Sequence, residues 1–254
     1  MAKIVAVNSF RRGVGRSSLT ANLMALLAIN GWRVGLVDAN IQSPSLHLMF
    51  NLSKDDVNHT LNDYLLGKCD IQETVYDVAP QLGAKMTSSA LLVPCDPNIN
   101  AITHIIRTGY DVQRIGAGVQ TLVEEFKLDL LLVDTQPGLN EDSLLVMAIL
   151  DIALVVLRTD KQDFEGTGIT LSVARSLNVP NIMLLVNEVP TLFDYARVAD
   201  QVKKRFNSDV VGILPHTDEM MALSSTDLFV LRYPNFALTR SLHEVARRLI
   251  YDGN

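Results

Sequence analysis

The chain has 254 residues, of which 48% are hydrophobic; this excludes a disordered protein and allows one α/β domain, residues 1–254. The 22 basic and 28 acidic residues give a formal charge of −6, which leaves no overall positive field for non-specific DNA binding, although a local basic patch stays open. The segment Met1–Val5 shows no signal-peptide pattern and no apolar run is long enough to span a membrane, so we expect a cytoplasmic protein without a strong membrane signal.

Short β-branched runs alternate with longer segments of helical period, a pattern typical of parallel βαβ units. In chain order, the expected strands are Lys3–Asn8, Val34–Val37, Leu130–Val133, Ile152–Leu157, Ile182–Val186 and Val210–Leu214. The expected helices are Ser17–Asn30, Val112–Phe126, Asp142–Leu150, Gly166–Leu177, Asp194–Phe206 and Leu238–Tyr251. In the less regular segment Leu52–Ser89 we expect a short helix opening at Asn58–Leu61 and an edge strand at Glu73–Val78. The predicted fold class is α/β: a single domain with a mostly parallel, twisted sheet and helices on both faces.

The first strand leads into a glycine-containing loop, Ser9–Ser18, and a helix follows at once. This arrangement aims backbone N–H groups and a helix N-terminus at phosphates. Gly13 and Gly15 would let the main chain curl closely round an anion, because no side chain blocks the approach. Ser17 is placed to offer its hydroxyl to Mg²⁺. The loop alone leaves a second interpretation open, a strand-to-helix turn that binds nothing.

The loop resembles the deviant Walker A sequence K-G-G-x-G-K-[ST] of the MinD/ParA family of P-loop ATPases. The positions that match are Gly13, Gly15 and Ser17. The family's signature lysine is Arg11 here, its first glycine is Arg12, and its phosphate-loop lysine is Arg16. Arginine keeps the charge and can bond two phosphate oxygens, but its planar head is larger than an ammonium group. We therefore expect Arg16 either to hold phosphates less well or to hinder them.

Carboxylates follow two of the expected strands. The segment after Val34–Val37 reads Asp38-Ala39-Asn40, where the family has D-x-D. The resemblance implies that Asp38 helps to position an attacking water, and Asn40 replaces the second acid. Asp134 follows Leu130–Val133 as a Walker B aspartate would, and in the family this carboxylate holds Mg²⁺, commonly through water.

Two later segments complete the resemblance, which covers Lys3–Leu249 in family order. Leu184–Asn187 resembles the strand whose final asparagine bonds the nucleotide base, and Gly212–Pro215 resembles the turn beside that base. The resemblance implies ATP or ADP and Mg²⁺ as cofactors, with Ser17 and Asp134 as the metal ligands. The implied nucleotide-binding residues are Arg12, Gly13, Val14, Gly15, Arg16, Ser17, Ser18, Asn187 and Pro215.

The family's mode of action is an ATP-sandwich homodimer, in which the signature basic residue, here Arg11, reaches the partner's phosphates. The catalytic candidates are Arg11 and Asp38. An arginine that reaches across the dimer interface, as Arg11 would, can stabilise phosphoryl charge. The altered positions nevertheless favour a switch that binds nucleotide better than it hydrolyses it. Such a switch would serve intracellular positioning or partitioning, together with an unidentified partner protein.

Two other interpretations stay open. One is a nucleotide-independent localisation scaffold resembling TadZ/CpaE, although nothing here corresponds to the receiver-like N-terminal domain of those proteins. The other is a P-loop ligase resembling the dethiobiotin or cobyrinate synthetases, which needs a substrate pocket and an intact loop lysine. Cluster-carrier relatives require paired cysteines, and Cys69 and Cys95 do not form such a pair.

Basic and apolar helix faces near the end of the chain have structural explanations. The last expected helix has an apolar face, and we expect that face to dock on the core rather than on a membrane. The residues of this face are Leu238, Leu242, Val245, Leu249 and Ile250. We interpret Lys203–Arg205 and Arg247–Arg248 as solvated helix faces rather than a DNA footprint.

Overall fold

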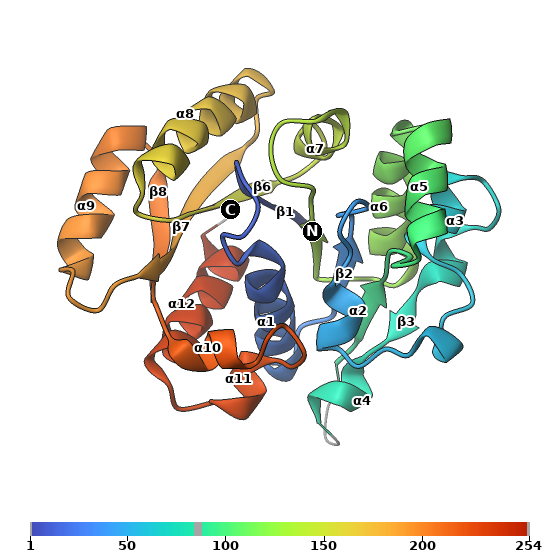
Figure 1. Ribbon diagram of the computed structural model, residues 1–254, viewed down its shortest axis with the longest axis horizontal. Coiled ribbons are helices and arrows are strands. Elements are labelled where there is room, and N and C mark those ends of the chain that lie inside the picture. The colour runs from blue at the N-terminus through green and yellow to red at the C-terminus, as the bar shows by residue number, and fades with distance from the viewer. Residues whose placement is uncertain (1, 84–87, 253–254) are drawn as a thin grey trace.

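The structure is a computed structural model, and it describes residues 2–83 and 88–252. Its centre is an eight-stranded sheet with the strand order β3-β4-β2-β5-β1-β6-β7-β8 (Figure 1). The strands are β1 (Lys3–Asn8), β2 (Val34–Asp38), β3 (Tyr76–Asp77), β4 (Ala90–Val93), β5 (Leu130–Asp134), β6 (Ile152–Leu157), β7 (Asn181–Val189) and β8 (Asp209–Pro215). Every neighbouring pair is parallel except β3 and β4, which are antiparallel.

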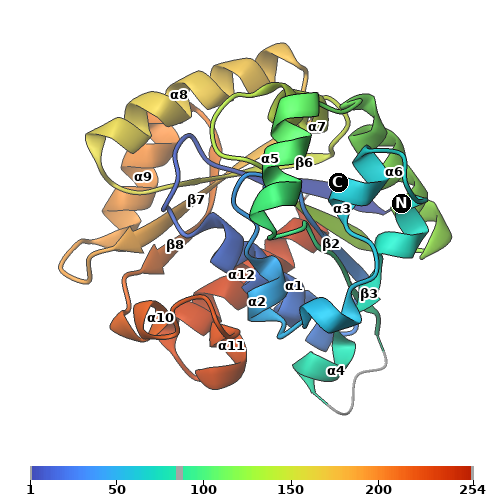
Figure 2. The same ribbon diagram turned by 45° about the vertical axis from the view of Figure 1, so that its right-hand side comes forward.

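Helices cover both faces of this sheet (Figures 1 and 2). One face carries α1 (Arg16–Ile29), α2 (Leu46–Met49), α4 (Ala79–Leu82), α10 (Asp218–Ala222), α11 (Phe229–Arg232) and α12 (Ala237–Tyr251). The other carries α3 (Leu61–Leu65), α5 (Ile99–Thr108), α6 (Gln113–Glu125), α7 (Glu141–Met147), α8 (Lys161–Ser176) and α9 (Tyr195–Phe206). Two 3₁₀ turns, Lys54–Asp56 and Ile71–Thr74, complete the elements of the described residues. The predicted fold class is therefore confirmed.

Each face of the sheet has its own hydrophobic core, and the central strands contribute to both. In β1, Val5 and Val7 pack in the core beneath α1 and α12, whereas Ile4 and Ala6 pack in the core beneath α6 and α7. Successive side chains of a strand point to opposite faces, so a strand that is covered twice must be apolar at every position. This is why these strands are recognisable as continuous apolar runs.

The carboxyl ends of the parallel strands meet at one edge of the sheet, and β1 lies at the point where the strand order reverses. From β1, the chain passes through α1 to β2 on one side, while β6, β7 and β8 follow on the other. Ligands of open α/β sheets bind at such a switch point, outside the carboxyl ends of the strands. Asp38 of β2 and Asp134 of β5 are register partners at this edge.

The structure extends and corrects the expected elements. The expectation that one helix begins at Gly166 is wrong, because α8 begins at Lys161, where the Asp160 side chain accepts a hydrogen bond from the Asp163 amide. The edge strand expected at Glu73–Val78 is present as β3, and the helix expected near Asn58–Leu61 is α3. Strand β4 and helices α2, α4, α5, α10 and α11 were not expected from the sequence.

The last helix docks on the core, as expected. Leu238, Leu242, Val245 and Leu249 of α12 are buried, and α12 packs against β8 and α1. Lys203–Arg205 of α9 are exposed, as expected for a solvated face. Within residues 2–83 and 88–252, none of the helices combines the length and the apolar character that crossing a membrane requires.

Candidate functional site

The loop between β1 and α1 contains two glycines in the left-handed region of backbone conformation. Gly13 has φ 77° and Gly15 has φ 84°, values that side-chain-bearing residues rarely adopt. A Cβ atom on Gly15 would also lie 2.5 Å from Nδ2 of Asn187, the residue near the end of β7. That same Nδ2 donates a 2.9 Å hydrogen bond to the carbonyl of Val14. The loop is therefore held against β7 by contacts that only glycine at position 15 permits.

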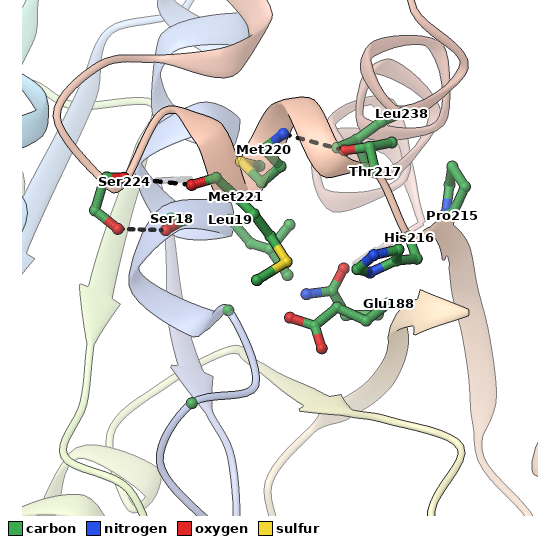
Figure 3. A pocket seen from close by; sticks show the side chains of 14 residues that line it. Ser18, Leu19, Glu188, Pro215, His216, Thr217, Met220, Met221, Ser224 and Leu238 are labelled. Atoms are coloured by element: carbon green, nitrogen blue, oxygen red, sulfur yellow. Dashed lines mark hydrogen bonds between the residues drawn. The ribbon is translucent and has the colours of Figure 1, made fainter. Parts of the chain in front are cut away.

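Two adjoining cavities open on either side of this loop. The first has a volume of about 250 Å³, and residues of the loop form most of its wall, joined by Asn40, Ser43, Ser45, Met49, Pro137 and Ser225. The second has a volume of about 270 Å³ and is lined by Asn187, Glu188, the segment 215–217 and residues of α1 and α10. Figure 3 shows Met221 and Leu19 opposite His216 and Glu188 in this second cavity. Gly13, Gly15, Ser18 and Ser225 line both cavities.

The chemistry of the two cavities differs in the way that a nucleotide requires. The loop cavity offers backbone amides, the N-terminus of α1 and three arginines to an anion. The second cavity offers apolar side chains such as Met220 and Met221 beside the polar Asn187, which suits a flat heteroaromatic base. The described residues therefore fit a nucleoside phosphate.

Arg16 and Asp134 form a buried ion pair beneath the loop. Nε of Arg16 donates to Oδ1 of Asp134 at 2.6 Å, and Nη1 of Arg16 donates to Oγ of Ser9 at 3.2 Å. The second oxygen of Asp134, Oδ2, accepts a 2.6 Å hydrogen bond from Oγ of Ser17. Asp134 is fully buried and Arg16 is 6% exposed, so each charge depends on the other for compensation.

This pair decides whether the predicted metal ligands fit Mg²⁺. Ser17 and Asp134 are adjacent, as expected for a metal site. A guanidinium group already lies on Asp134, and a second cation there would meet a like charge in a poorly hydrated place. Within the described part of the chain, no cluster of three or more histidine, cysteine or acidic side chains could hold a metal ion. Ser17 and Asp134 therefore do not fit Mg²⁺, whereas the two cavities do fit a nucleotide.

Asp38 lies behind the loop cavity with its carboxylate turned to the backbone. It accepts hydrogen bonds from the amides of Asn40, Ser45 and Leu46 at 3.1–3.2 Å. Complete burial and the charge of Asp134 raise the pKa of Asp38 to about 7, although these three donors lower it. Asn40 lines the loop cavity, and its Nδ2 bonds the carbonyl of Ser43 at 2.8 Å.

The first half of the loop packs against α8. Arg11 pairs with Asp160 and Asp163 and donates to Oε1 of Gln162 at 3.0 Å. The ring of Phe10 lies against Gly166, where an added Cβ would come within 2.0 Å of that ring. In this chain Arg11 thus contacts its own α8, and its reach to a partner subunit stays a prediction.

The structure brings all nine predicted nucleotide-binding residues together around the two cavities. Pro215 ends β8 and lines the second cavity with Asn187, whose amide nitrogen is committed to the loop carbonyl. Arg12 lines the loop cavity and donates to Oε1 of Gln42 at 2.8 Å. Sequence reasoning missed the rest of the second cavity's wall, namely Leu19, Glu188, His216, Thr217, Met220, Met221, Ser224, Ser225 and Leu238. A threonine N-cap before the acidic first turn of α10 was the signal that could have located it.

Comparison with known proteins places the chain in a family. The family model described as "ParA: NUBPL iron-transfer P-loop NTPase" matches residues 1–250. An uncharacterized ATP-binding protein of Methanocaldococcus jannaschii is 25% identical over 98% of this chain and 88% of its own length. The septum site-determining protein MinD of Thermotoga maritima is 22% identical over 100% of this chain and 90% of its own length.

A solved structure shows the same fold. The septum site-determining protein MinD of Pyrococcus horikoshii, complexed with Mg-ADP, superposes with a TM-score of 0.78 at 17% identity, covering 100% of this chain and 98% of that one. The family-model match, residues 1–250, extends over nearly the whole sequence. The chain belongs to the ParA family of P-loop NTPases.

Proposed function

We propose that this protein binds an adenine nucleotide across the two adjoining cavities and acts as a nucleotide-dependent homodimeric switch, with slow or impaired hydrolysis. The process it serves is intracellular positioning or partitioning, in line with relatives named septum site-determining protein. The observation that carries the proposal is the loop itself. Its two left-handed glycines stand at the N-terminus of α1, between an arginine-lined cavity and a partly apolar one.

Nucleotide binding is supported by the match between ligand and cavity. The phosphates would take the backbone amides of the loop, with Arg12 and Arg16 as charged donors. The base would take the second cavity, against Pro215 and Asn187. A relative that shares nearly the whole chain is named an ATP-binding protein.

Slow hydrolysis is supported by the state of the two catalytic candidates. The Asp38 carboxylate is occupied by three backbone donors, and a pKa of about 7 leaves a large fraction protonated at neutral pH. Arg11 is engaged by Asp160 and Asp163, so it must leave α8 before it can stabilise phosphoryl charge elsewhere. We expect turnover below about 1 s⁻¹, the low end of ordinary enzyme rates.

Iron transfer, which the matching family model names, has less support. Cys95 is buried after β4, and burial raises the pKa of its thiol well above the ordinary value. Cys69 is half-buried in the segment after α3, and both thiols are free. No observation in the described residues favours this second candidate.

The test combines calorimetric titration with sizing of the complex. Purified protein is titrated with the non-hydrolysable analogue AMPPNP, and the molar mass of the mixture is measured by light scattering. We expect saturable binding and a mass that doubles only with AMPPNP. Binding to a monomer would contradict the switch, and the absence of binding would favour a nucleotide-independent scaffold.

A matched variant separates the site from the rest of the fold. Gly15→Ala places a Cβ atom of the loop against Asn187 of β7. Gly31→Ala strains the backbone in a similar way, because Gly31 has φ 94°, but its Cβ would have no other atom within 4 Å. We expect Gly15→Ala to lose AMPPNP binding and Gly31→Ala to keep it. Release of phosphate from ATP faster than about 1 s⁻¹ would contradict impaired hydrolysis.

A further inference from the structure

The guanidinium group of Arg16 lies where the resemblance predicts a divalent cation. We propose that Arg16 is a built-in counter-ion that replaces this cation, so that the protein binds its nucleotide without Mg²⁺. This inference rests on the proposed nucleotide binding and deepens it. Its subject is the buried triad of Arg16, Asp134 and Ser17.

Both oxygens of the Asp134 carboxylate are already engaged. Oδ1 accepts from Arg16 at 2.6 Å and Oδ2 accepts from Ser17 at 2.6 Å, and the carboxylate is fully buried. Mg²⁺ requires near-octahedral oxygen ligands and gives up its waters reluctantly. To use Oδ1 as a ligand, directly or through a water, the ion would have to displace the guanidinium group of Arg16, which would then lose its buried partner.

The charges around the loop cavity also favour binding without Mg²⁺. Three arginines, Arg11, Arg12 and Arg16, line it, and its wall contains no aspartate or glutamate among the residues described. Asn40, a neutral residue, lines it where the family pattern has an acid. A magnesium ion commonly neutralises phosphate charge and needs carboxylates to hold it. This cavity supplies the positive charge from side chains and offers no exposed carboxylate.

Arg16 can serve Asp134 and a phosphate at once. A guanidinium group carries five N–H donors in a planar fork, and Nε and Nη1 make the bonds to Asp134 and Ser9. Arg16 also lines the loop cavity, so its other N–H donors are the ones that we assign to a phosphate. A lysine in this place has a single compact ammonium group and could not span both partners in the same way.

The experiment measures the affinity for ADP by calorimetry in excess Mg²⁺ and in excess EDTA. For the natural protein we expect two dissociation constants within about threefold of each other. Arg16→Lys frees one oxygen of Asp134, and we expect its affinity for ADP to become at least about tenfold tighter with Mg²⁺ than with EDTA. Arg12→Lys is the matched control, because Arg12 lines the same cavity and donates to Gln42 rather than to Asp134, so the ratio of its two dissociation constants stays near one whatever happens to the affinity itself.

Electron paramagnetic resonance with Mn²⁺ gives a second readout that does not depend on Arg16→Lys folding. In the natural protein saturated with ADP, we expect the protein to add no bound Mn²⁺ beyond the amount that free ADP holds. One tightly bound Mn²⁺ per chain overturns the inference, and so does an affinity for ADP that requires Mg²⁺. An Arg16→Lys variant that folds and stays independent of Mg²⁺ also overturns it.

These outcomes separate the two proposals. ADP binding that needs Mg²⁺ leaves the proposed function standing and removes the inference alone. The absence of ADP binding in both conditions removes the proposed function, and the inference with it.

Discussion

The two halves of the phosphate loop carry the same substitution in opposite surroundings. Arg11, in the first half, is 26% exposed and pairs with two carboxylates at the start of α8, Asp160, which is 43% exposed, and Asp163, which is 2% exposed. Arg16, in the second half, is 6% exposed and pairs with a fully buried carboxylate at the end of β5. One guanidinium group therefore acts in partly hydrated surroundings, and the other acts where water is excluded.

This difference shows that a change from lysine to arginine has no fixed consequence. Near the surface, an arginine gains hydrogen bonds at low cost and can exchange one partner for another. Beneath the loop, it becomes part of the folded structure, because the removal of either partner leaves an isolated buried charge. Arg11, in the first half of the loop, can therefore change partners, whereas Arg16, in the second half, keeps its position on Asp134.

The largest expected effect comes from deleting each guanidinium group in turn. Arg16→Ala should lower the free energy of unfolding by about 3–5 kcal/mol, because Asp134 is left buried without a counter-ion. Arg11→Ala should lower it by only about 1 kcal/mol, because Arg11 and Asp160 are partly exposed and the buried Asp163 keeps the guanidinium group of Arg158 at 3.6 Å. Urea denaturation of both variants measures the difference. Equal losses of stability in the two variants would contradict the difference between the two ion pairs.

A double variant sharpens the same point. Arg16→Met combined with Asp134→Leu removes both charges and fills a similar volume, so it should recover most of the stability that Arg16→Ala loses. Urea denaturation of the double variant checks this. A double variant as unstable as Arg16→Ala would show that the buried charge is not the cause.

The second half of the loop should also be the less tolerant in its backbone. Gly15→Ala forces a left-handed residue to carry a Cβ at 2.5 Å from Asn187, and we expect it to cost about 1–3 kcal/mol of stability. Gly13→Ala has similar backbone strain but nothing within 4 Å, so it should cost less. Thermal unfolding of the two variants gives the order. A larger loss for Gly13→Ala would contradict the contact with β7.

The buried carboxylate of Asp38 should make stability depend on pH. The pKa of Asp38 is raised to about 7 from an ordinary value of 3.8, so the folded protein binds this proton more tightly than the unfolded chain does. The contribution of Asp38 to stability should therefore rise as the pH falls from about 7 towards 4, by at most about 1.4 kcal/mol per pH unit. Urea midpoints measured across this range, compared with those of Asp38→Asn, isolate that slope. A natural protein and an Asp38→Asn variant with parallel profiles would disprove the assignment.

The smallest expected effect concerns the mobility of Arg11. Asp160→Asn keeps the oxygen that caps α8 but removes one charge that holds Arg11. We expect the AMPPNP-dependent dimer to form a few-fold more tightly, because Arg11 leaves α8 at lower cost. Glu165→Gln is the control, since Glu165 lies on the same helix and pairs with Lys161 instead. Analytical ultracentrifugation compares the dimer dissociation constants, and an equal tightening in both variants would exclude a role for Arg11.

How far the sequence predicts this molecule depends on the range of the interactions involved. The strands from β1 to β8 that are buried on both faces appear as unbroken apolar runs, and the loop glycines follow the first of them directly. Strand β4 has only four residues and follows an irregular segment, so its pattern was too short to recognise.

The pairing inside the site lay beyond sequence reasoning for a different reason. Arg16 and Asp134 are 118 positions apart, and only the sheet order brings β5 next to β1. The contact of Arg11 with Gln162 of α8 spans a longer separation, 151 positions. The loop motif predicted where a phosphate would lie, but not which carboxylate each arginine would find.

A crystal structure of the protein grown with AMPPNP and Mg²⁺ would show whether a nucleotide binds across the two cavities. We expect the phosphates to lie on the backbone amides of Gly13–Ser18, the base to lie against Pro215, and Arg16 to remain on Asp134. A nucleotide bound elsewhere, or a loop cavity that stays empty at saturating AMPPNP, would contradict nucleotide binding at this site.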